Sequence, residues 1–370
     1  MTSYRLLLLG LLMLVTSTGA WAHKASDSFI YLDQTGDQAS LRLDLALRDL
    51  ALVLPLDRNG DRQVTGAELT GARADITAYV AGGLTVASSA GNCILQGRKW
   101  GLSRHSDGPY AAASYQVSCP EGATPTTLEY TLLFDTDPLH RALVQQTTAD
   151  GEQLMVIGPQ STSLALEADS TGWFKTFTDF LYQGVVHLVL GYDHVLFLLV
   201  LILPATIVRG ARLGTAATRR RVMELAGIVT AFTVAHSLTL GLAALNVVRP
   251  PITWVEIVIA LSIGLAAVNL FWPVLGEKTW RLAFGFGLIH GFGFASVLGD
   301  LTSGASQTVL ALAGFNLGVE LGQLALLVLV FPLLLWLARY RFYQKAAVPM
   351  VAVAVSAVSL YWVIERVALL

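Results

Sequence analysis

Four histidines lie inside hydrophobic stretches that are long enough to cross a lipid bilayer, and several carboxylates and one amide accompany them at similar depth. Burying an ionisable group in hydrocarbon costs roughly 2.5–3.5 kcal/mol on insertion scales, so such residues are usually retained for a function. Imidazole nitrogens and carboxylate oxygens together suit a divalent transition-metal ion, and this chemistry is the main functional clue. The residues concerned are His187, His194, His236, His290, Asp193, Glu256, Glu320 and Asn316.

The elements that must position these residues are six apolar stretches that follow residue 178. Each is near or above the ~20 residues that a helix needs to span a membrane. The chain as a whole is 54% hydrophobic and 14% charged, which is too apolar for an ordinary soluble protein. The region 178–370 is therefore predicted to be a polytopic α-helical membrane domain of about six transmembrane helices. The stretches are 180–203, 222–245, 252–272, 280–299, 308–337 and 347–364.

The spacing of the histidines predicts how they meet. His187 and His194 are seven residues apart in the first stretch, so one continuous helix would place them on one face, about 10 Å apart in depth. Asp193 is expected to ligate the ion directly or to accept a proton from an imidazole. One helix cannot supply a full coordination shell, so ligands from other stretches must converge. The predicted ligands are His187, Asp193, His194, His236, His290, Glu256 and Glu320, with Asn316 expected to make a hydrogen bond between helices.

The N-terminus has the features of a secretory signal peptide over residues 1–22. Arg5 is followed by the apolar run 6–15 and by the small-x-small sequence Ala20-Trp21-Ala22. The mature chain would begin at His23, whose α-amine and imidazole could chelate one metal ion, preferentially copper; an ordinary flexible terminus is the alternative. Residues 23–170 are then exported.

The exported segment is predicted to be a small, antiparallel, β-rich domain with one helical insertion. Apolar and polar residues alternate over 28–33, 39–47 and 127–135, as in half-buried strands, and 66–82 is typical of a short helix. The only two cysteines, Cys93 and Cys119, fall in this segment, and an oxidising compartment predicts that they form a disulfide. His105 and His140 are expected at the surface.

The charges of the connecting segments predict the orientation of the membrane domain. Basic residues cluster after the first, third and fifth stretches, whereas 246–251 has one arginine and 300–307 has no basic residue. The positive-inside rule places the basic links in the cytoplasm, which agrees with an exported N-terminal domain. A bacterial-type inner membrane location follows, with the N-terminal domain in the periplasm or outside. The basic residues are Arg209, Arg212, Arg219, Arg220, Arg221, Lys278, Arg281, Arg339, Arg341 and Lys345.

The segment 57–68 resembles an EF-hand calcium loop. Arg62 stands at position 6, where a glycine is usual, so weakened calcium binding in a structural role is predicted. An acidic turn before a helix is the alternative. The ligand positions 1, 3, 5, 7, 9 and 12 are Asp57, Asn59, Asp61, Gln63, Thr65 and Glu68.

Five stretches of the membrane region resemble the HupE/UreJ family of membrane proteins, and the chain is similar to its long branch, which has an exported domain ahead of the membrane domain. The HxxxxxDH element of that family is matched by His187, Asp193 and His194. The resemblance implies uptake of nickel or cobalt. The matching stretches are 187–199, 230–240, 255–263, 286–295 and 315–324.

Three classes of function are compatible with these observations. The first is a permease for a divalent transition metal, nickel or cobalt above all, with copper or zinc as alternatives; its partners are the ion and the bilayer. No GxxxxGK[ST] loop is present, and the net charge of −2 does not indicate nucleic acid. The second is an intramembrane metalloenzyme with zinc or iron, although no HExxH motif occurs. The third is a metal sensor, copper-handling protein or assembly factor without transport. The oligomeric state stays open.

Overall fold

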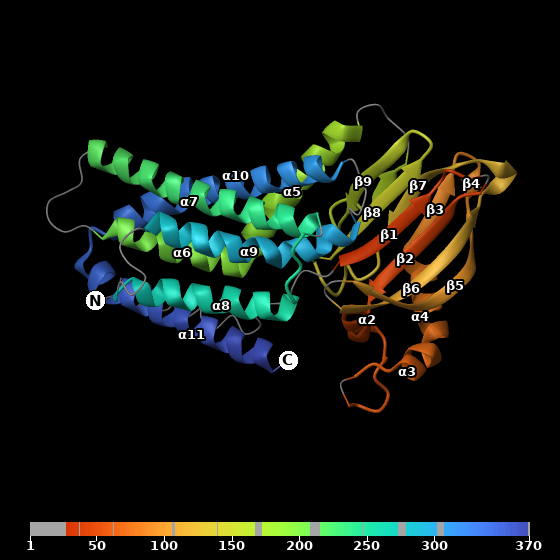
Figure 1. Ribbon diagram of the computed structural model, residues 1–370, viewed down its shortest axis with the longest axis horizontal. Helices are drawn as coiled ribbons and strands as arrows, with labels where there is room; N and C mark the ends of the chain where they lie inside the picture. The colour runs from red at the N-terminus through yellow and green to blue at the C-terminus, as the bar shows by residue number, and fades with distance from the viewer. Residues whose placement is uncertain are drawn as a thin grey trace.

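The computed structural model describes residues 27–368 except for residues 37, 62, 106–107, 139, 167–171, 208–214, 246, 273–278 and 302–306. A β domain sits at one end of a bundle of long helices that run side by side (Figure 1). Several sequence predictions fall outside the described residues, namely the signal peptide 1–22, His23, Arg62, Arg209, Arg212 and Lys278.

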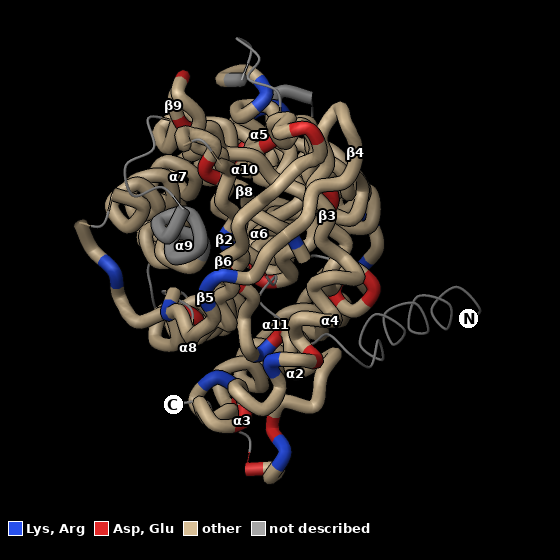
Figure 2. Tube along the Cα trace, turned by 90° about the vertical axis from the view of Figure 1, so that its right-hand side faces the viewer, with Lys and Arg blue, Asp and Glu red and all other residues tan. Residues whose placement is uncertain are grey.

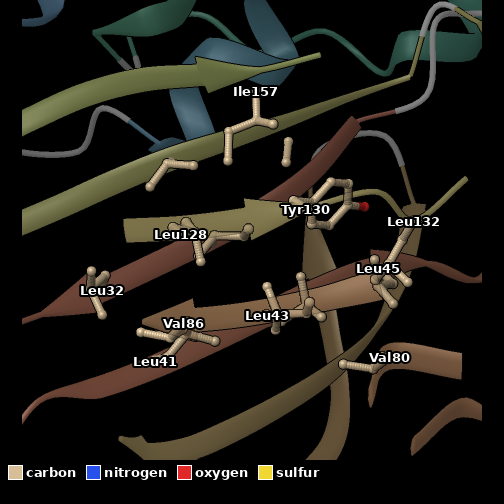
Figure 3. Close-up of a cluster of buried hydrophobic side chains, with 14 of the residues drawn as sticks. Leu32, Leu41, Leu43, Leu45, Val80, Val86, Leu128, Tyr130, Leu132 and Ile157 are labelled. Carbon is tan, nitrogen blue, oxygen red and sulfur yellow. The ribbon is translucent and has the colours of Figure 1, made fainter. Parts of the chain in front are cut away.

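The β domain is a sandwich of two sheets. The six-stranded sheet has the order β5-β6-β2-β1-β8-β9, and the four-stranded sheet has the order β10-β7-β3-β4. Leucine, valine and isoleucine side chains from both sheets fill the space between them, as the labelled residues of Figure 3 show. The strands are β1 (Asp27–Asp33), β2 (Ser40–Ala46), β3 (Leu84–Ser88), β4 (Gly91–Asn92), β5 (Ile94–His105), β6 (Gly108–Ser118), β7 (Pro125–Tyr130), β8 (Arg141–Thr148), β9 (Gly151–Ile157) and β10 (Ser163–Ala165).

The larger sheet is covered on both faces, so its central strands need apolar residues on both of their sides. Ile30 and Leu32 of β1 face the smaller sheet, whereas Phe29 packs in a cluster with side chains of the helix bundle. Strands buried on both faces are apolar at successive positions, as β1 and β8 are. These two strands pair in parallel, so the predicted antiparallel arrangement holds for the other described strand pairs but not for this one. The connection between them contains most of the domain, which allows the parallel crossover.

The predicted disulfide and the predicted helical insertion of the β domain are present. Cys93 and Cys119 form a disulfide. The predicted helix 66–82 is present as two helices that meet at Ala72, and a further short helix follows β2. The predicted strand 127–135 ends early, because the chain turns after Tyr130 and Leu133 has a positive φ of 66°. The helices are α2 (Leu47–Val53), α3 (Gly66–Gly71) and α4 (Arg73–Gly83).

Seven helices form the bundle. Four helical segments within the described residues are long and apolar enough to cross a membrane, and a bent pair, α5 with α6, raises the number to as many as five. Their outward-facing side chains are apolar, as in Val328 and Leu329, which are 70% and 74% exposed. The predicted stretch 280–299 lies in α9, and its crossing as a sixth span stays a prediction. The helices are α5 (Gly172–Leu190), α6 (Tyr192–Thr206), α7 (Thr215–Ala244), α8 (Ile252–Asn269), α9 (Thr279–Leu301), α10 (Thr308–Leu337) and α11 (Val348–Val367).

Small residues let the helix backbones approach closely. A Cβ atom built on Gly318 of α10 would lie 2.0 Å from the Leu181 carbonyl oxygen of α5, and one on Gly291 of α9 would lie 2.3 Å from the His236 carbonyl oxygen of α7. Membrane helices lack a hydrophobic drive to associate, so such close van der Waals packing holds them together. The contact at Gly291 also brings two histidine-bearing helices together.

The buried carboxyl group of Asp49, on α2, should make the stability of the β domain depend on pH. The carboxyl group is buried, one oxygen accepts a hydrogen bond from Arg48, and the other has no hydrogen-bond partner among the described residues. Burial raises the pKa of Asp49 to about 6. The folded chain therefore holds this proton more tightly than the unfolded chain, whose aspartate pKa is about 3.9, and the stability falls as the pH rises from about 4 to 6.

We expect Asp49→Asn to raise the melting temperature of the protein by a few degrees at pH 8, because the amide has no charge to bury. The gain should disappear near pH 4, where the native carboxyl group is protonated as well. Thermal unfolding across this pH range measures both effects. An equal gain at pH 4 and pH 8 would contradict the role given to ionisation.

Candidate metal centre

The first membrane segment is broken where its two histidines lie. Helix α5 ends at Leu190, α6 begins at Tyr192, and the two are bent by 69°. Between them, Gly191 has an extended backbone conformation, with φ −75° and ψ 95°. A Cβ atom at this position would lie 2.6 Å from the His187 carbonyl oxygen and 3.0 Å from Nδ1 of His194. The break thus needs a residue without a side chain.

This break corrects the prediction that His187 and His194 share one face of a continuous helix. His187 lies in the last turn of α5, and His194 lies in the first turn of α6. Their ring centroids are 4.8 Å apart, whereas seven residues of straight helix would separate them by about 10 Å. The sequence spacing gave no sign of this, although a glycine between two histidines is compatible with a bend.

Two further imidazoles meet His194 from other helices. The ring of His290, on α9, has its centroid 5.3 Å from that of His194, and the ring of His236, on α7, lies 6.4 Å away. His194, His236 and His290 are 4%, 0% and 2% exposed, so the three rings are shielded from the surroundings of the bundle. The structure therefore brings together histidines from four helices.

The Nδ1 atoms of three histidines are hydrogen-bonded to oxygen acceptors. Nδ1 of His194 lies 2.9 Å from a carboxylate oxygen of Asp193, and Nδ1 of His290 lies 2.9 Å from the Phe286 carbonyl oxygen. Nδ1 of His236 lies 3.1 Å from Oδ1 of Asn316. Since these oxygens only accept, each Nδ1 must carry the proton and donate it. In a neutral imidazole the other nitrogen, Nε2, then holds a lone pair.

The three Nε2 atoms have no hydrogen-bond partner among the described residues, although each is buried. Leaving a buried polar atom unpaired costs about 1–3 kcal/mol, and native proteins rarely tolerate it without a reason. Three such atoms on rings gathered around His194 are best explained by a ligand that accepts lone pairs. A metal cation is the simplest such ligand.

The rings of His187 and His290 lie at the distance from His194 that is usual for imidazoles around one ion, whereas the ring of His236 lies farther away. With metal–nitrogen bonds of about 2.0–2.1 Å, imidazoles that share an ion have ring centres roughly 5 Å apart. Within the described part of the chain, however, no group of three or more His, Cys, Asp or Glu side chains is arranged to hold a metal ion. Binding would therefore require the rings to turn toward one another.

The predicted carboxylate ligands divide into two groups. Asp193 belongs to the histidine cluster through its bond to His194. Glu256 of α8 lies beside Arg366, with Oε2 3.9 Å from Nε, and Glu320 of α10 accepts a hydrogen bond of 2.6 Å from the Thr230 hydroxyl group. Among the described residues, the contacts of Glu256 and Glu320 are with Arg366 and Thr230 and not with the imidazoles, so their role as ligands stays a prediction.

Two histidines of the β domain were wrongly predicted to lie at the surface. His105 is 9% exposed and is bonded to Asp44 at 2.7 Å, and His140 is fully buried against Ser28 and Tyr130. Burial lowers the pKa of His140 to about 3, so this imidazole is neutral and structural. Neither burial was predictable from local pattern, because His105 ends a strand whose side chains are mostly exposed and His140 lies just before β8.

The calcium-type loop precedes α3, where Figure 2 shows acidic and basic residues close together. Gly60, with φ 75°, donates its N–H to Asp57, and the Gln63 N–H is bonded to Asp61. The Glu68 carboxylate accepts N–H groups of Arg58 and Thr65, so it folds back over the start of the loop. Calcium binding by Asp57, Asn59, Asp61, Gln63, Thr65 and Glu68 stays a prediction.

The HupE / UreJ protein family profile matches residues 162–366, which is more than half of the chain and includes every membrane-domain histidine. The chain belongs to the HupE/UreJ family. Together with the apolar helices, this membership identifies it as a membrane protein. No curated protein matches the chain.

A substitution at the helix break tests whether its geometry is required. Gly191→Ala should destabilise this HupE/UreJ protein by about 1–3 kcal/mol, because the new methyl group overlaps the His187 carbonyl oxygen and the His194 ring. The matched control is Gly241→Ala on α7, where a Cβ atom meets nothing within 4 Å. Thermal unfolding in detergent compares the two, and equal melting temperatures would show that the break accommodates a side chain.

The calcium loop is tested in the same assay. Millimolar calcium should raise the melting temperature of the native chain and have no effect on Glu68→Gln, because the bidentate ligand at position 12 is lost. A chelator should reverse the rise. Identical responses of both proteins would leave 57–68 as an acidic turn before a helix.

Proposed function

We propose that this protein is a permease for a divalent transition-metal ion of the nickel or cobalt type. The observation that carries the proposal is the set of three buried Nε2 atoms, on His194, His236 and His290, whose Nδ1 atoms are held by oxygen acceptors. In metal sites, a ligating histidine usually donates its other N–H to a carboxylate or carbonyl oxygen, which fixes the tautomer and the ring orientation. The same arrangement recurs here on three helices.

The donor set favours borderline ions over hard or soft ones. Imidazole nitrogens suit nickel, cobalt, copper and zinc, and the membrane domain contains no cysteine to select a soft ion. Asp193 supplies a negative charge that a divalent cation needs in a medium of low dielectric constant. Family membership agrees with this preference, since HupE/UreJ proteins are associated with nickel and cobalt uptake.

The proposed route begins at the end of the bundle that carries the β domain, for which the predicted signal peptide and the positive-inside rule favour a position outside the cytoplasm. Glu256 attracts the ion, His187, Asp193 and His194 bind it, and His236, His290 and Glu320 pass it inward. An inside-negative potential of 100 mV supplies about 4.6 kcal/mol for two charges, so inward movement needs no nucleotide hydrolysis. For this path, Glu256 would have to leave Arg366 and Glu320 would have to leave Thr230.

Substitution of the central histidine tests the proposal. His194→Ala should reduce nickel or cobalt accumulation in expressing cells at least roughly tenfold, because the ring that lies beside three other imidazoles is lost. Ser356→Ala is the matched control, since its hydroxyl group bonds only the Ala352 carbonyl oxygen of its own helix in the described structure.

Unchanged accumulation in His194→Ala would remove the permease proposal. Purified protein in liposomes separates the remaining alternatives. A tightly held metal without ion flux would favour an intramembrane metalloenzyme. Metal-dependent binding of another protein through 23–170, again without flux, would favour a sensor or assembly factor.

A further inference from the structure

The larger sheet of the β domain presents a mixed apolar and charged face to the helix bundle. Phe29, Tyr110, Leu143 and Leu154 pack there with side chains of α5, α7 and α10. The Thr176 hydroxyl group of α5 also donates to the Leu154 carbonyl oxygen at 3.1 Å. The β domain is therefore seated on the end of the bundle through this contact.

Arg141 is a buried charged residue at this contact. It begins β8 and is only 6% exposed. Its Nε and Nη2 atoms lie 3.0 and 2.9 Å from Oδ1 of Asp27, the first residue of β1, which is itself 2% exposed. A buried guanidinium needs such a carboxylate partner, and the parallel register of β1 and β8 pairs Asp27 directly with Arg141.

The third contact of Arg141 reaches into the membrane domain. Its Nη1 atom donates to Oε1 of Gln183 on α5 at 3.3 Å. Gln183 lies four residues before His187, so the two side chains share one face of α5, one turn apart. The guanidinium is also within electrostatic reach of the His187 imidazole. The β domain thus places a fixed positive charge one helical turn from the first histidine of the cluster.

We propose that Arg141 is the gate on the β-domain side of the metal route. While the guanidinium is bound to Asp27 and Gln183, its charge repels cations from His187. Access requires the guanidinium to leave Gln183, and an incoming divalent cation then takes its place as the counter-charge of Asp27. The carboxylate of Asp27 is neutralised by the Arg141 guanidinium or by the incoming cation, but not by both at once. The inference rests on the proposed permease function, and it gives the β domain a role in that function.

The gate can be tested without any metal. The chain has only two cysteines, and both are in the disulfide, so His187→Cys introduces a single free thiol below Arg141. Its labelling rate with a cationic methanethiosulfonate reagent, applied from the β-domain side, reports access. Adding Arg141→Gln should accelerate labelling at least roughly tenfold. The acceleration should be smaller for a neutral reagent of similar size, since removal of a charge favours cations above all.

Two variants serve as controls. Arg141→Lys keeps the charge and should label as slowly as the parent. Arg42→Gln removes an arginine of the same sheet whose partners, Asp44 and Ser103, lie within the β domain, and it should also label slowly. Melting temperatures identify any variant that has lost its fold, and in that case the lysine variant and the comparison of the two reagents still decide the matter.

An unchanged labelling rate in Arg141→Gln, or equal acceleration by Arg42→Gln, would overturn the gate. Metal flux through liposomes is measured separately. Faster labelling together with absence of flux in the native protein would reject the permease and retain the gate. Flux in the native protein with unaltered labelling in Arg141→Gln would retain the permease and reject the gate.

Discussion

The structure depends on the direction in which three imidazoles hold their protons. In a bundle that lies among lipids, an imidazole nitrogen without a partner cannot be satisfied by bulk water. The acceptors Asp193, Asn316 and the Phe286 carbonyl oxygen take the Nδ1 protons and leave the Nε2 lone pairs facing protein. A bound lone-pair acceptor such as the proposed metal ion would recover the free energy lost in this arrangement, which connects the stability of the bundle to its proposed function.

Much of the surrounding architecture serves this arrangement. Broken helices are common at cation sites of transporters, because they place helix ends and side chains at mid-membrane depth. Here the break at Gly191 brings His187 and His194 together, and the glycine contact at Gly291 brings α9 against α7. The β domain adds a guanidinium above α5. A cation route through the contact would therefore be controlled by the domain and by the bundle together.

The sequence predicted what depends on local pattern. Six membrane stretches were predicted from apolar length. The described helices support four of them, or five if the bent pair α5 and α6 is one span, and α10 has the predicted limits of 308–337. Histidine depth predicted which rings would meet, since imidazoles in hydrocarbon have few alternatives to one another. The two cysteines of an exported segment predicted the disulfide. In each case, one property of one segment was sufficient.

What the sequence could not predict depends on contacts between distant segments. The 69° bend arises because Gly191 fits between a carbonyl oxygen and an imidazole, and a heptad spacing of histidines is equally compatible with a straight helix. The parallel pairing of β1 with β8 joins segments more than a hundred residues apart. Asn316 makes the predicted hydrogen bond between helices, but the sequence did not identify the Nδ1 atom of His236 as its partner. Arg141 lies in no sequence motif, so its position at the contact was not predictable from the sequence.

The most direct test of the central claim is X-ray absorption spectroscopy of the purified protein loaded with nickel or cobalt. Coordination by the three unpaired Nε2 atoms predicts a first shell of nitrogen and oxygen near 2.0–2.1 Å with the outer-shell scattering of about three imidazoles. A shell of oxygen alone, without imidazole scattering, would mean that the cluster does not hold the ion and would contradict the account.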